Sequence, residues 1–490
     1  MYLGIDLGTS EVKVILINER QDIVATAHAP LAIERPKPLW SEQHPADWWR
    51  ATQAAIADIH RDYQEQLSEV RGIGLSGQMH GAVLLDVKDQ VLRPAILWND
   101  VRSGEECIEL EQRIPALRQL TGNVAMPGFT APKLLWVAKN EPEIFQKTAK
   151  VLLPKDYLRL LLTGEYVSDM SDASGTLWLD VEKRDWSDVM LSATGLSRTH
   201  MPALIEGSAP GGLLKPELAS AWGIKARAVV AGGAGDNAAS AIGMGVIEDG
   251  QGFISLGTSG VFFAATDTYR PNPAQGLHTF CHALPNQWHQ MGVMLSAANC
   301  LRWVTQLTDS RNEAALLAEI EQISEPLGAD TPLFLPYLSG ERTPHNNPQA
   351  KGVWFGLSNG TDRGLLGYSV LEGVAFGLRE SYLALQDAGS SVRTASLVGG
   401  GSKSAYWAGL LSDVLNVRLN LHSSADVGAA LGAARLGMMA ANPGADIAAI
   451  CSPPPVTHVI QPRPERHAAL LPRFKKYREL YAALKPLFAA

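Results

Sequence analysis

The sequence carries one short motif twice, about half a chain apart. Residues 4–10 read Gly-Ile-Asp-Leu-Gly-Thr-Ser, and residues 254–260 read Ile-Ser-Leu-Gly-Thr-Ser-Gly. In each copy one apolar run precedes the turn and another follows it, which is the pattern of a β-hairpin with a Gly-Thr-Ser turn. A single repeat at this separation indicates two related halves rather than a solenoid of many units.

The segments after each hairpin alternate between strand-like and helix-like patterns. In the first half we expect a strand at 23–27, a helix from Pro45, and strands at 72–75 and 228–231. In the second half we expect a helix at 365–385, a strand at 395–398, a helix at 404–415, a strand at 418–421 and a helix at 427–439. Such alternation is typical of α/β layers with helices on both faces of each sheet. We predict two domains, 1–245 and 246–490.

Composition limits the functional class. The formal net charge of −8 argues against a nucleic-acid binder, which usually has a basic balance. The four cysteines are scattered without a CxxC pair, as expected in a reducing, cytoplasmic compartment. No apolar run is long enough to span a bilayer, and no signal-peptide pattern opens the chain. We therefore expect a soluble cytoplasmic protein with small-molecule partners, no nucleic acid and no membrane; a homodimer is compatible with the sequence, which does not define the oligomeric state.

The two Gly-Thr-Ser turns suit a phosphate clamp. Glycine lets an anion approach the backbone, and successive N–H groups and hydroxyls supply donors. Any single copy is more simply a hairpin turn, but two matched copies favour phosphate binding. Asp6 of the first copy is Ser255 in the second. A carboxylate beside a phosphate turn can hold a nucleotide-bound Mg²⁺ through water, although a turn-capping acid is the alternative.

A third glycine cluster, 399–401, follows the strand that ends at Val398. It is not a Walker A loop, because Lys403 follows Ser402 instead of Gly. The cluster could let adenosine or phosphate lie against the backbone. A tight helix-entry turn explains the segment equally well.

Two polar clusters in the first half each follow an apolar run: Gln78-Met79-His80 and Trp98-Asn99-Asp100. We expect both at strand ends that line one cleft. Amides, a histidine and a tryptophan suit a polyol, since they offer hydrogen bonds to hydroxyls and an apolar face to C–H groups. Taken alone, His80 reads as a structural histidine. Residues 341–344, Glu-Arg-Thr-Pro, read as a surface loop fixed by an ion pair.

Asp236 follows the glycine-rich segment 232–235 at a predicted strand-to-helix turn. An acid there reaches into a cleft, with a helix N-terminus behind it that favours anions. Asp236 is therefore our candidate general base for a sugar hydroxyl, with a capping aspartate as the structural alternative. The spacing Gly233-x-Gly235-x-x-Ala238 also matches a dinucleotide fingerprint, but no βαβ partner with a ribose-binding acid accompanies it.

Taken together, these motifs resemble those of the FGGY carbohydrate kinases over nearly the whole chain, and most closely the bacterial kinases of D-xylulose. The resemblance rests on segments 4–10, 77–81, 96–100, 128–136, 153–157, 235–239, 335–344, 399–401 and 426–434. It implies two actin-like, ribonuclease-H-like α/β ATPase domains that flank a catalytic cleft. It also implies that ATP and Mg²⁺ are used to phosphorylate D-xylulose to D-xylulose 5-phosphate.

The same resemblance implies roles for single residues. Asp236 is expected to accept the sugar proton, and Asp6 to support the Mg²⁺-nucleotide. The sugar pocket is expected to contain Met79 and His80, which match the family's xylulose-binding pair, with Gln78, Trp98, Asn99 and Asp100. The nucleotide is expected to contact Gly8, Thr9, Ser10, Lys13, Gly257, Thr258, Ser259, Gly400, Gly401 and Ser404.

Two residues depart from the family pattern. Glu11 stands where the family usually has glycine, which adds a negative charge near a triphosphate. Ala234 interrupts the glycines before Asp236 and narrows the conformations open to that turn. Three alternatives remain: an FGGY kinase of ribulose, fuculose, glycerol or gluconate; an actin-like ATPase module without kinase activity; and, on the fingerprint alone, an NAD-dependent dehydrogenase.

Overall fold

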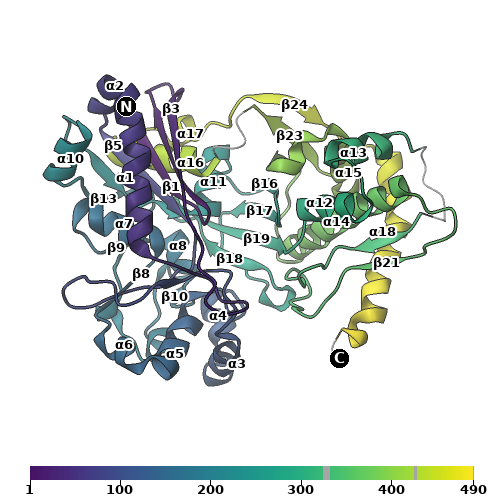
Figure 1. Ribbon diagram of the computed structural model, residues 1–490, viewed down its shortest axis with the longest axis horizontal. Coiled ribbons are helices and arrows are strands. Elements are labelled where there is room, and N and C mark those ends of the chain that lie inside the picture. The colour runs from purple at the N-terminus through teal and green to yellow at the C-terminus, as the bar shows by residue number, and fades with distance from the viewer. Residues whose placement is uncertain (324–330, 424–427, 489–490) are drawn as a thin grey trace.

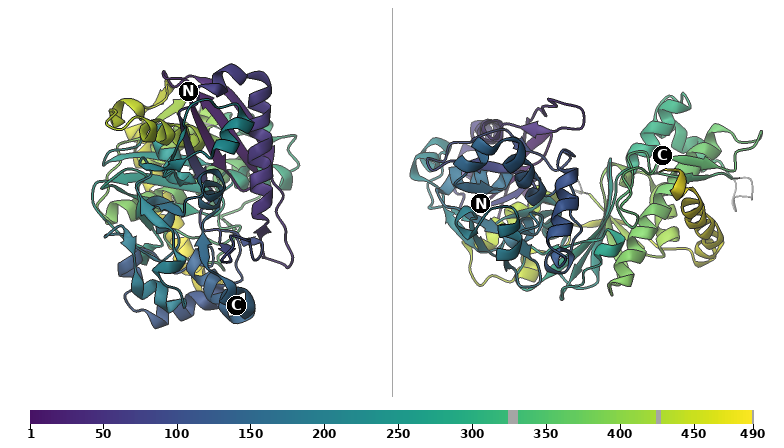
Figure 2. Two further views of the ribbon diagram at one scale, coloured as in Figure 1. Left: turned by 90° about the vertical axis from the view of Figure 1, so that its left-hand side faces the viewer. Right: turned by 90° about the horizontal axis from the view of Figure 1, so that it is seen from below.

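The computed structural model describes residues 1–323, 331–423 and 428–488, and it consists of two α/β lobes (Figure 1). The N-terminus lies in the first lobe and the C-terminus in the second. Figure 2 shows the same two lobes from two other directions.

Each lobe is built around a seven-stranded sheet. The first sheet contains β1 (Tyr2–Leu7), β2 (Glu11–Ile17), β3 (Ile23–Pro30), β5 (Gly72–Gly77), β13 (Pro210–Leu213), β14 (Val229–Ala231) and β15 (Ala234–Gly235). The second contains β16 (Gln251–Leu256), β17 (Gly260–Thr266), β18 (His278–Cys281), β19 (Trp288–Met294), β22 (Thr394–Val398), β23 (Arg418–His422) and β24 (Val456–Ile460).

The two sheets share one strand order. In the first, β14-β5-β1-β2-β3 lie side by side, and in the second the matching order is β23-β22-β16-β17-β19. In both, three neighbouring strands are antiparallel, β1-β2-β3 in the first sheet and β16-β17-β19 in the second. The other two strands of each set, β5 and β14 or β22 and β23, join in parallel. Both predicted hairpins are therefore confirmed, and they lie at equivalent places in the two lobes.

The predicted helices are also present. The helices used below are α1 (Pro45–Asp62), α5 (Thr130–Asn140), α7 (Pro154–Thr163), α8 (Met170–Ser174), α11 (Asp236–Met244), α14 (Arg363–Asp387), α15 (Ala405–Leu415), α16 (Gly428–Ala441) and α18 (Pro464–Leu484). Proline suits the first turn of α1, because it lacks the N–H that would otherwise stay unbonded there. Position 427, where we predicted the start of α16, lies outside the described residues.

Helix α16 comes late in the sequence but packs on the first sheet (Figure 1). A Cβ on Gly74 of β5 would lie 1.6 Å from the carbonyl oxygen of Ala433. One on Gly432 would lie 1.7 Å from that of Ala239 in α11. The helix therefore touches backbone on both sides, an approach that only glycine permits. Because the chain returns to the first lobe in this way, the division after residue 245 stays a prediction.

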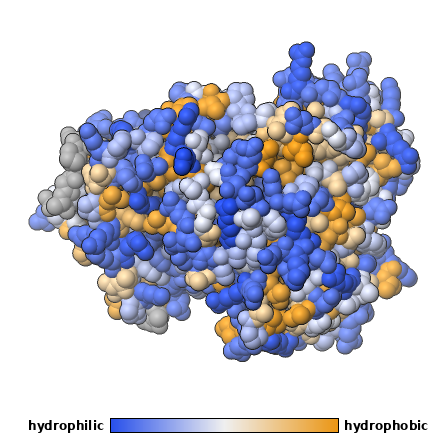
Figure 3. Space-filling model, turned by 180° about the vertical axis from the view of Figure 1, so that it is seen from behind, coloured by the Kyte–Doolittle hydropathy of each residue, from blue (hydrophilic) through white to orange (hydrophobic). Residues whose placement is uncertain are grey.

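An apolar core joins the lobes. It contains Leu134 of α5 and Trp178 from the first half, and Phe263 of β17 and Phe280 of β18 from the second. The rear face of the molecule is mostly hydrophilic, with its apolar residues in separate patches (Figure 3). In the described part of the chain, no helix is both long enough and apolar enough to cross a bilayer.

Candidate active site

Asp6 lies near the end of β1, in a cavity of about 280 Å³ between the lobes. Lys13 and Ser240 line this cavity from the first half, and Ser255 and Gly399 line it from the second. Asp6 and Ser255 each precede the last residue of the first hairpin strand of their lobe. Both copies of the repeated motif therefore face one space.

The surroundings of Asp6 suit a hydrated cation. The Ser76 hydroxyl donates to Asp6 Oδ1 at 2.9 Å, and Lys13 is the cross-strand neighbour of Asp6. Burial raises the pKa of Asp6, while the Ser76 bond and the charge of Lys13 oppose that rise. Mg²⁺ keeps several waters and binds one or two carboxylates together with substrate phosphates. One carboxylate in a cavity with two serine hydroxyls fits that coordination.

Asp236 is the first residue of α11. The backbone N–H and side-chain amide of Asn237 donate to its Oδ1 at 2.7 and 2.9 Å, and no described residue donates to its Oδ2. Burial, followed by the charge of Asp6, raises the pKa of Asp236 to about 6, against the opposing effect of the Asn237 bonds. At neutral pH this carboxylate is ionised, yet it binds a proton more readily than an ordinary aspartate. A general base needs both properties.

The loop before Asp236 accommodates its single alanine. The positive φ of the segment, 75°, falls on Gly233, whereas Ala234 lies in β15 and pairs with β5. The departure at Ala234 therefore causes no strain. The N–H groups of Gly232 and Gly233 donate to the carbonyl oxygens of Ala209 and Gly207 at 2.8 and 2.9 Å. They are not available to a pyrophosphate, which removes the support for the dinucleotide hypothesis.

His80 follows β5 with a positive φ of 70°. Its Nδ1 lies 2.7 Å from the carbonyl oxygen of Gly175, which can only accept, so Nδ1 carries the proton and Nε2 is left as an acceptor. Burial, followed by the charge of Lys133, lowers the pKa of His80 to about 3. Phe129 packs edge-on against the ring, with centroids 4.8 Å apart. His80 is therefore a fixed, neutral hydrogen-bond acceptor.

Met79 connects His80 to the Asp236 loop. A Cβ on Gly235 would lie 2.9 Å from Met79 Sδ, and one on Gly175 would lie 3.0 Å from Met79 Cε. The pair 79–80 therefore lies directly beside the residue that precedes Asp236. These two predicted segments, far apart in the sequence, are adjacent in the structure.

Gln78 and Trp98 support the first Gly-Thr-Ser turn. The Thr9 hydroxyl donates to Gln78 Oε1 at 3.1 Å and accepts from Trp98 Nε1 at 3.0 Å. The other end of the Gln78 amide donates to Gln43 Oε1 at 2.9 Å. Both polar ends of Gln78 are thus bonded within the protein, whereas Trp98 is 42% exposed. The contacts join the predicted sugar and phosphate segments.

Asp100 and Asn99 differ in what they can offer a ligand. Asp100 is 1% exposed, and Arg102 binds its two oxygens at 2.9 and 2.7 Å. The backbone N–H of Ser41 also donates to Asp100, at 2.6 Å. By contrast, Asn99 Oδ1 is buried and accepts no hydrogen bond from the described residues. Because buried polar atoms are rarely left unbonded, Asn99 is the member of this cluster with an acceptor to spare.

A larger cavity of about 810 Å³ lies in the second lobe. Its lining includes five of the residues predicted to bind nucleotide: Gly257, Thr258, Gly400, Gly401 and Ser404. Asn299, Arg302 and Asn312 also line it, and no motif in the sequence pointed to them. Ser259 lies in the turn but outside this lining, and Ser404 also caps α15 by accepting from the Trp407 N–H at 3.2 Å. The cavity has the size of a ligand pocket.

Glu11, which follows the first Gly-Thr-Ser turn, has neighbours for its carboxylate. Its carboxylate lies 3.2 Å from His28 Nδ1 and 4.0 Å from Lys13 Nζ, with 46% of its side chain exposed. The Lys13 ammonium and solvent therefore reduce the repulsion of an anion by Glu11. The turn itself contains Gly8 and the exposed Ser10, whose carbonyl oxygen accepts from the Leu31 N–H at 2.8 Å.

The prediction of a surface loop at 341–344 is wrong. Glu341 is 2% exposed, and its carboxylate accepts from the N–H groups of Leu295 and Arg342 at 3.0 and 2.7 Å. Arg342 Nη1 lies 3.3 Å from His278 Nε2, and its charge adds to the low pKa of His80. The segment therefore faces the His80 side of the site. Residues 331–340, directly before this segment, contain no charged residue, and this feature of the sequence could have indicated that the segment is buried.

Comparisons with known proteins identify the family of the chain. The FGGY carbohydrate kinase N-terminal domain matches residues 1–243, and the C-terminal domain of that family matches residues 252–441. Over 489 residues the chain is 53% identical to the xylulose kinase of Escherichia coli (strain K12), with 100% of both chains covered. A crystal structure of a "xyloylose kinase" from Brucella ovis is 52% identical, with a TM-score of 0.96 over 99% of each chain. A Plasmodium falciparum glycerol kinase with ADP, 21% identical over 97% of each chain, has the same fold with a TM-score of 0.89. The chain, with its two actin-like α/β lobes, therefore belongs to the FGGY family of carbohydrate kinases.

Proposed function

We propose that this kinase transfers the γ-phosphoryl group of ATP to the terminal hydroxyl of D-xylulose, giving ADP and D-xylulose 5-phosphate. The observation that carries the proposal is the place of Asp236, a carboxylate of raised pKa that directly follows the Gly235 contact with Met79 and is close enough to Asp6 for the charge of Asp6 to raise that pKa. The relative in Escherichia coli, which shares about half of the residues over its full length, is named for this substrate.

Asp236 acts as the general base. A sugar alcohol is a weak nucleophile because it holds its proton tightly. Asp236 Oδ2, which no described residue bonds, accepts that proton as the O–P bond forms. Such base catalysis contributes roughly 10²–10⁴-fold to the rate. His80 Nε2 accepts from a second hydroxyl, Asn99 Oδ1 is available to another, and Trp98 covers the C–H face of the sugar.

The nucleotide occupies the second lobe in this proposal. The cavity of about 810 Å³ takes adenosine against Gly400 and Gly401, with the phosphates toward Gly257 and Thr258. Asp6 would hold Mg²⁺ through water, and the metal would supply charge neutralisation to the phosphates. Gly8, Thr9, Ser10 and Lys13 complete the clamp from the first lobe, opposite Ser259 and Ser404.

The domain roles, location and assembly follow as further proposals. Residues 1–245 bind the sugar and carry Asp236, and residues 246–490 bind ATP. The four cysteines are all buried and free, which supports a reducing, cytoplasmic location. A homodimer stays a prediction that analytical ultracentrifugation would check.

The test is an ADP-release assay across D-xylulose, ribulose, fuculose, glycerol and gluconate, with NMR of the phosphorylated product. We expect the highest kcat/KM with D-xylulose and phosphate on O5. If another acceptor gave a kcat/KM ten times that of D-xylulose, that acceptor would be the substrate and the proposal would be wrong. ADP release that needs no acceptor would instead favour an ATPase module.

A further inference from the structure

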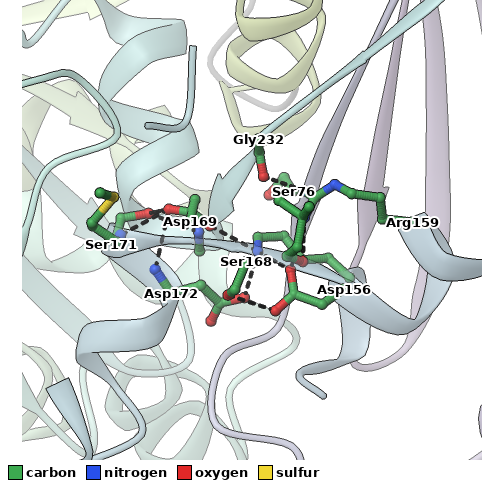
Figure 4. A network of polar contacts seen from close by, with 12 residues as sticks. Ser76, Asp156, Arg159, Ser168, Asp169, Ser171, Asp172 and Gly232 are labelled. Carbon is green, nitrogen blue, oxygen red and sulfur yellow. Dashed lines mark hydrogen bonds and ion pairs between the residues drawn. The ribbon is translucent and has the colours of Figure 1, made fainter. Parts of the chain in front are cut away.

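The loop that carries Asp236 rests on a buried ionic network. Lys155 Nζ lies 2.7 Å from Asp156 Oδ1, 2.7 Å from Asp169 Oδ1 and 3.2 Å from Asp172 Oδ2. All four side chains are fully buried. Figure 4 shows the three carboxylates close together, with Arg159 extending toward Gly232. Buried ions at this density are costly to hold unless they are paired, so the network calls for a functional reason.

The network holds one more carboxylate than cations. Arg159 pairs with Asp156 at 3.2 Å, so two cations face three carboxylates. Burial raises the pKa of Asp172 well above its ordinary value.

Two short segments supply these groups. Helix α7 carries Lys155, Asp156 and Arg159 on its first turns. Asp169 caps α8 by accepting from the Ser171 N–H at 2.8 Å and from the Asp172 N–H at 3.3 Å. The cap fixes the first turn of α8, and with it the direction of the Ser171 side chain.

The network reaches the Asp236 loop at two points. Arg159 donates to the carbonyl oxygens of Ala231, at 3.2 Å, and Gly232. Ser171 Oγ donates its proton to Asp169 Oδ2 and accepts from the Gly235 N–H at 3.2 Å. The single hydroxyl proton of Ser171 is donated to Asp169. A lone pair of Ser171 Oγ is therefore free to accept the N–H of the peptide that joins Ala234 to Gly235.

We propose that Ser171 is a positioning residue for Asp236, oriented by Asp169 and, through it, by Lys155. The inference rests on the proposed role of Asp236 as the base. Without the Ser171 hydroxyl, the Gly235 N–H loses its acceptor, and the peptide that joins Ala234 to Gly235, one residue before Asp236, is held less firmly. A shift of about 1 Å in a reacting group can cost about 10²-fold in rate. We expect Ser171→Ala to lower kcat about 10- to 100-fold, with KM for D-xylulose and for ATP within threefold of wild type.

Ser168 offers a matched control. Its hydroxyl donates to Asp156 Oδ2 at 2.7 Å, in the same network and equally buried. Ser168→Ala therefore removes a hydroxyl–carboxylate bond of the same kind. No hydrogen bond among the described residues joins the Ser168 side chain to the Asp236 loop. The two substitutions should lower the urea-unfolding midpoint by similar amounts, but only Ser171→Ala should lower kcat.

The experiment compares wild type, Ser168→Ala, Ser171→Ala and Asp236→Asn in one ADP-release assay, with D-xylulose binding measured by calorimetry. Ser171→Cys, which keeps the volume but weakens the acceptor, repeats the test if the alanine variant does not fold. A kcat of Ser171→Ala within twofold of wild type overturns the inference, as does an equal loss in Ser168→Ala, or failure of both Ser171 variants to fold. If Asp236→Asn alone is inactive, the proposed function stands and only the positioning role falls. If Asp236→Asn stays active, the proposed base itself fails.

Discussion

Asp6 and Ser255 occupy equivalent positions in two sheets of one strand order, and both line the cavity between the lobes. Only one of the two is a carboxylate. A hydrated Mg²⁺ needs few protein carboxylates, whereas a second acid there would repel the triphosphate. The difference between the two copies therefore fits the proposed roles of the lobes, in which the first supports the metal and the second holds the nucleotide.

Replacing Asp6 should affect both metal use and the base. We expect Asp6→Asn to raise the Mg²⁺ concentration needed for half-maximal activity at least tenfold. Because the charge of Asp6 raises the pKa of Asp236, the substitution should also move the acid limb of kcat/KM to lower pH. Mg²⁺ titrations and pH profiles check both effects. An unchanged acid limb would show that the two carboxylates do not interact.

The pH dependence of the wild type should follow Asp236. The base works only when it is ionised, so kcat/KM for D-xylulose should fall about tenfold per unit below pH 6. His80, with a pKa of about 3, stays neutral over this range. The Kd for D-xylulose should therefore be constant between pH 5 and 8. An acid limb near pH 4, or sugar binding that weakens in parallel with kcat/KM, would contradict these assignments.

Asp236 should reduce the stability of the folded protein at neutral pH. Its pKa of about 6 in the fold lies above the ordinary 3.8, so folding loses stability as pH rises from about 4 to 6. Asp236→Asn removes this loss, and we expect it to raise the free energy of unfolding by ~1–3 kcal/mol at pH 7. Below pH 4 the two proteins should be equally stable. Urea unfolding at both pH values checks the expectation, and a variant that is less stable at pH 7 would contradict it.

His80 should matter for the sugar and not for the nucleotide. We expect His80→Asn, which tolerates the positive φ, to raise KM for D-xylulose about 10- to 100-fold, in line with a lost hydrogen bond worth roughly 1–3 kcal/mol. KM for ATP should stay within twofold of wild type. His458→Asn on the exposed strand β24 is the matched control and should change neither constant. Equal effects on both KM values would place His80 outside the sugar pocket.

Local patterns were sufficient to predict the hairpins, the helices α1, α14, α15 and α16, and the place of Asp236 at a strand-to-helix turn. Each of these depends on neighbours in the sequence: alternating apolar residues, a glycine turn, or a strand that runs into a helix. The bonding of Gln78 to Thr9 and of Asp100 to Arg102 could not be predicted, because it depends on which side chains meet after folding.

Two further features that the sequence did not predict, the packing of α16 and the contact of Arg342, also depend on long-range contacts. Helix α16 packs on the first sheet at Gly74 and on α11 through Gly432, because a glycine at each contact lets two backbones touch across a large sequence separation. Arg342 contacts His278 of β18 in the second sheet, and its charge lowers the pKa of His80 in the first lobe. Neither contact leaves a periodic signal in the sequence.

The central claim is that Asp236 takes the proton of a bound sugar alcohol, and Asp236→Asn tests it most directly. The measurement pairs the single-turnover rate of phosphoryl transfer with the Kd for D-xylulose. We predict a rate lower by roughly 10²–10⁴-fold with a Kd within threefold of wild type. Transfer at a near-normal rate would contradict the account, and so would loss of sugar binding in parallel with the rate.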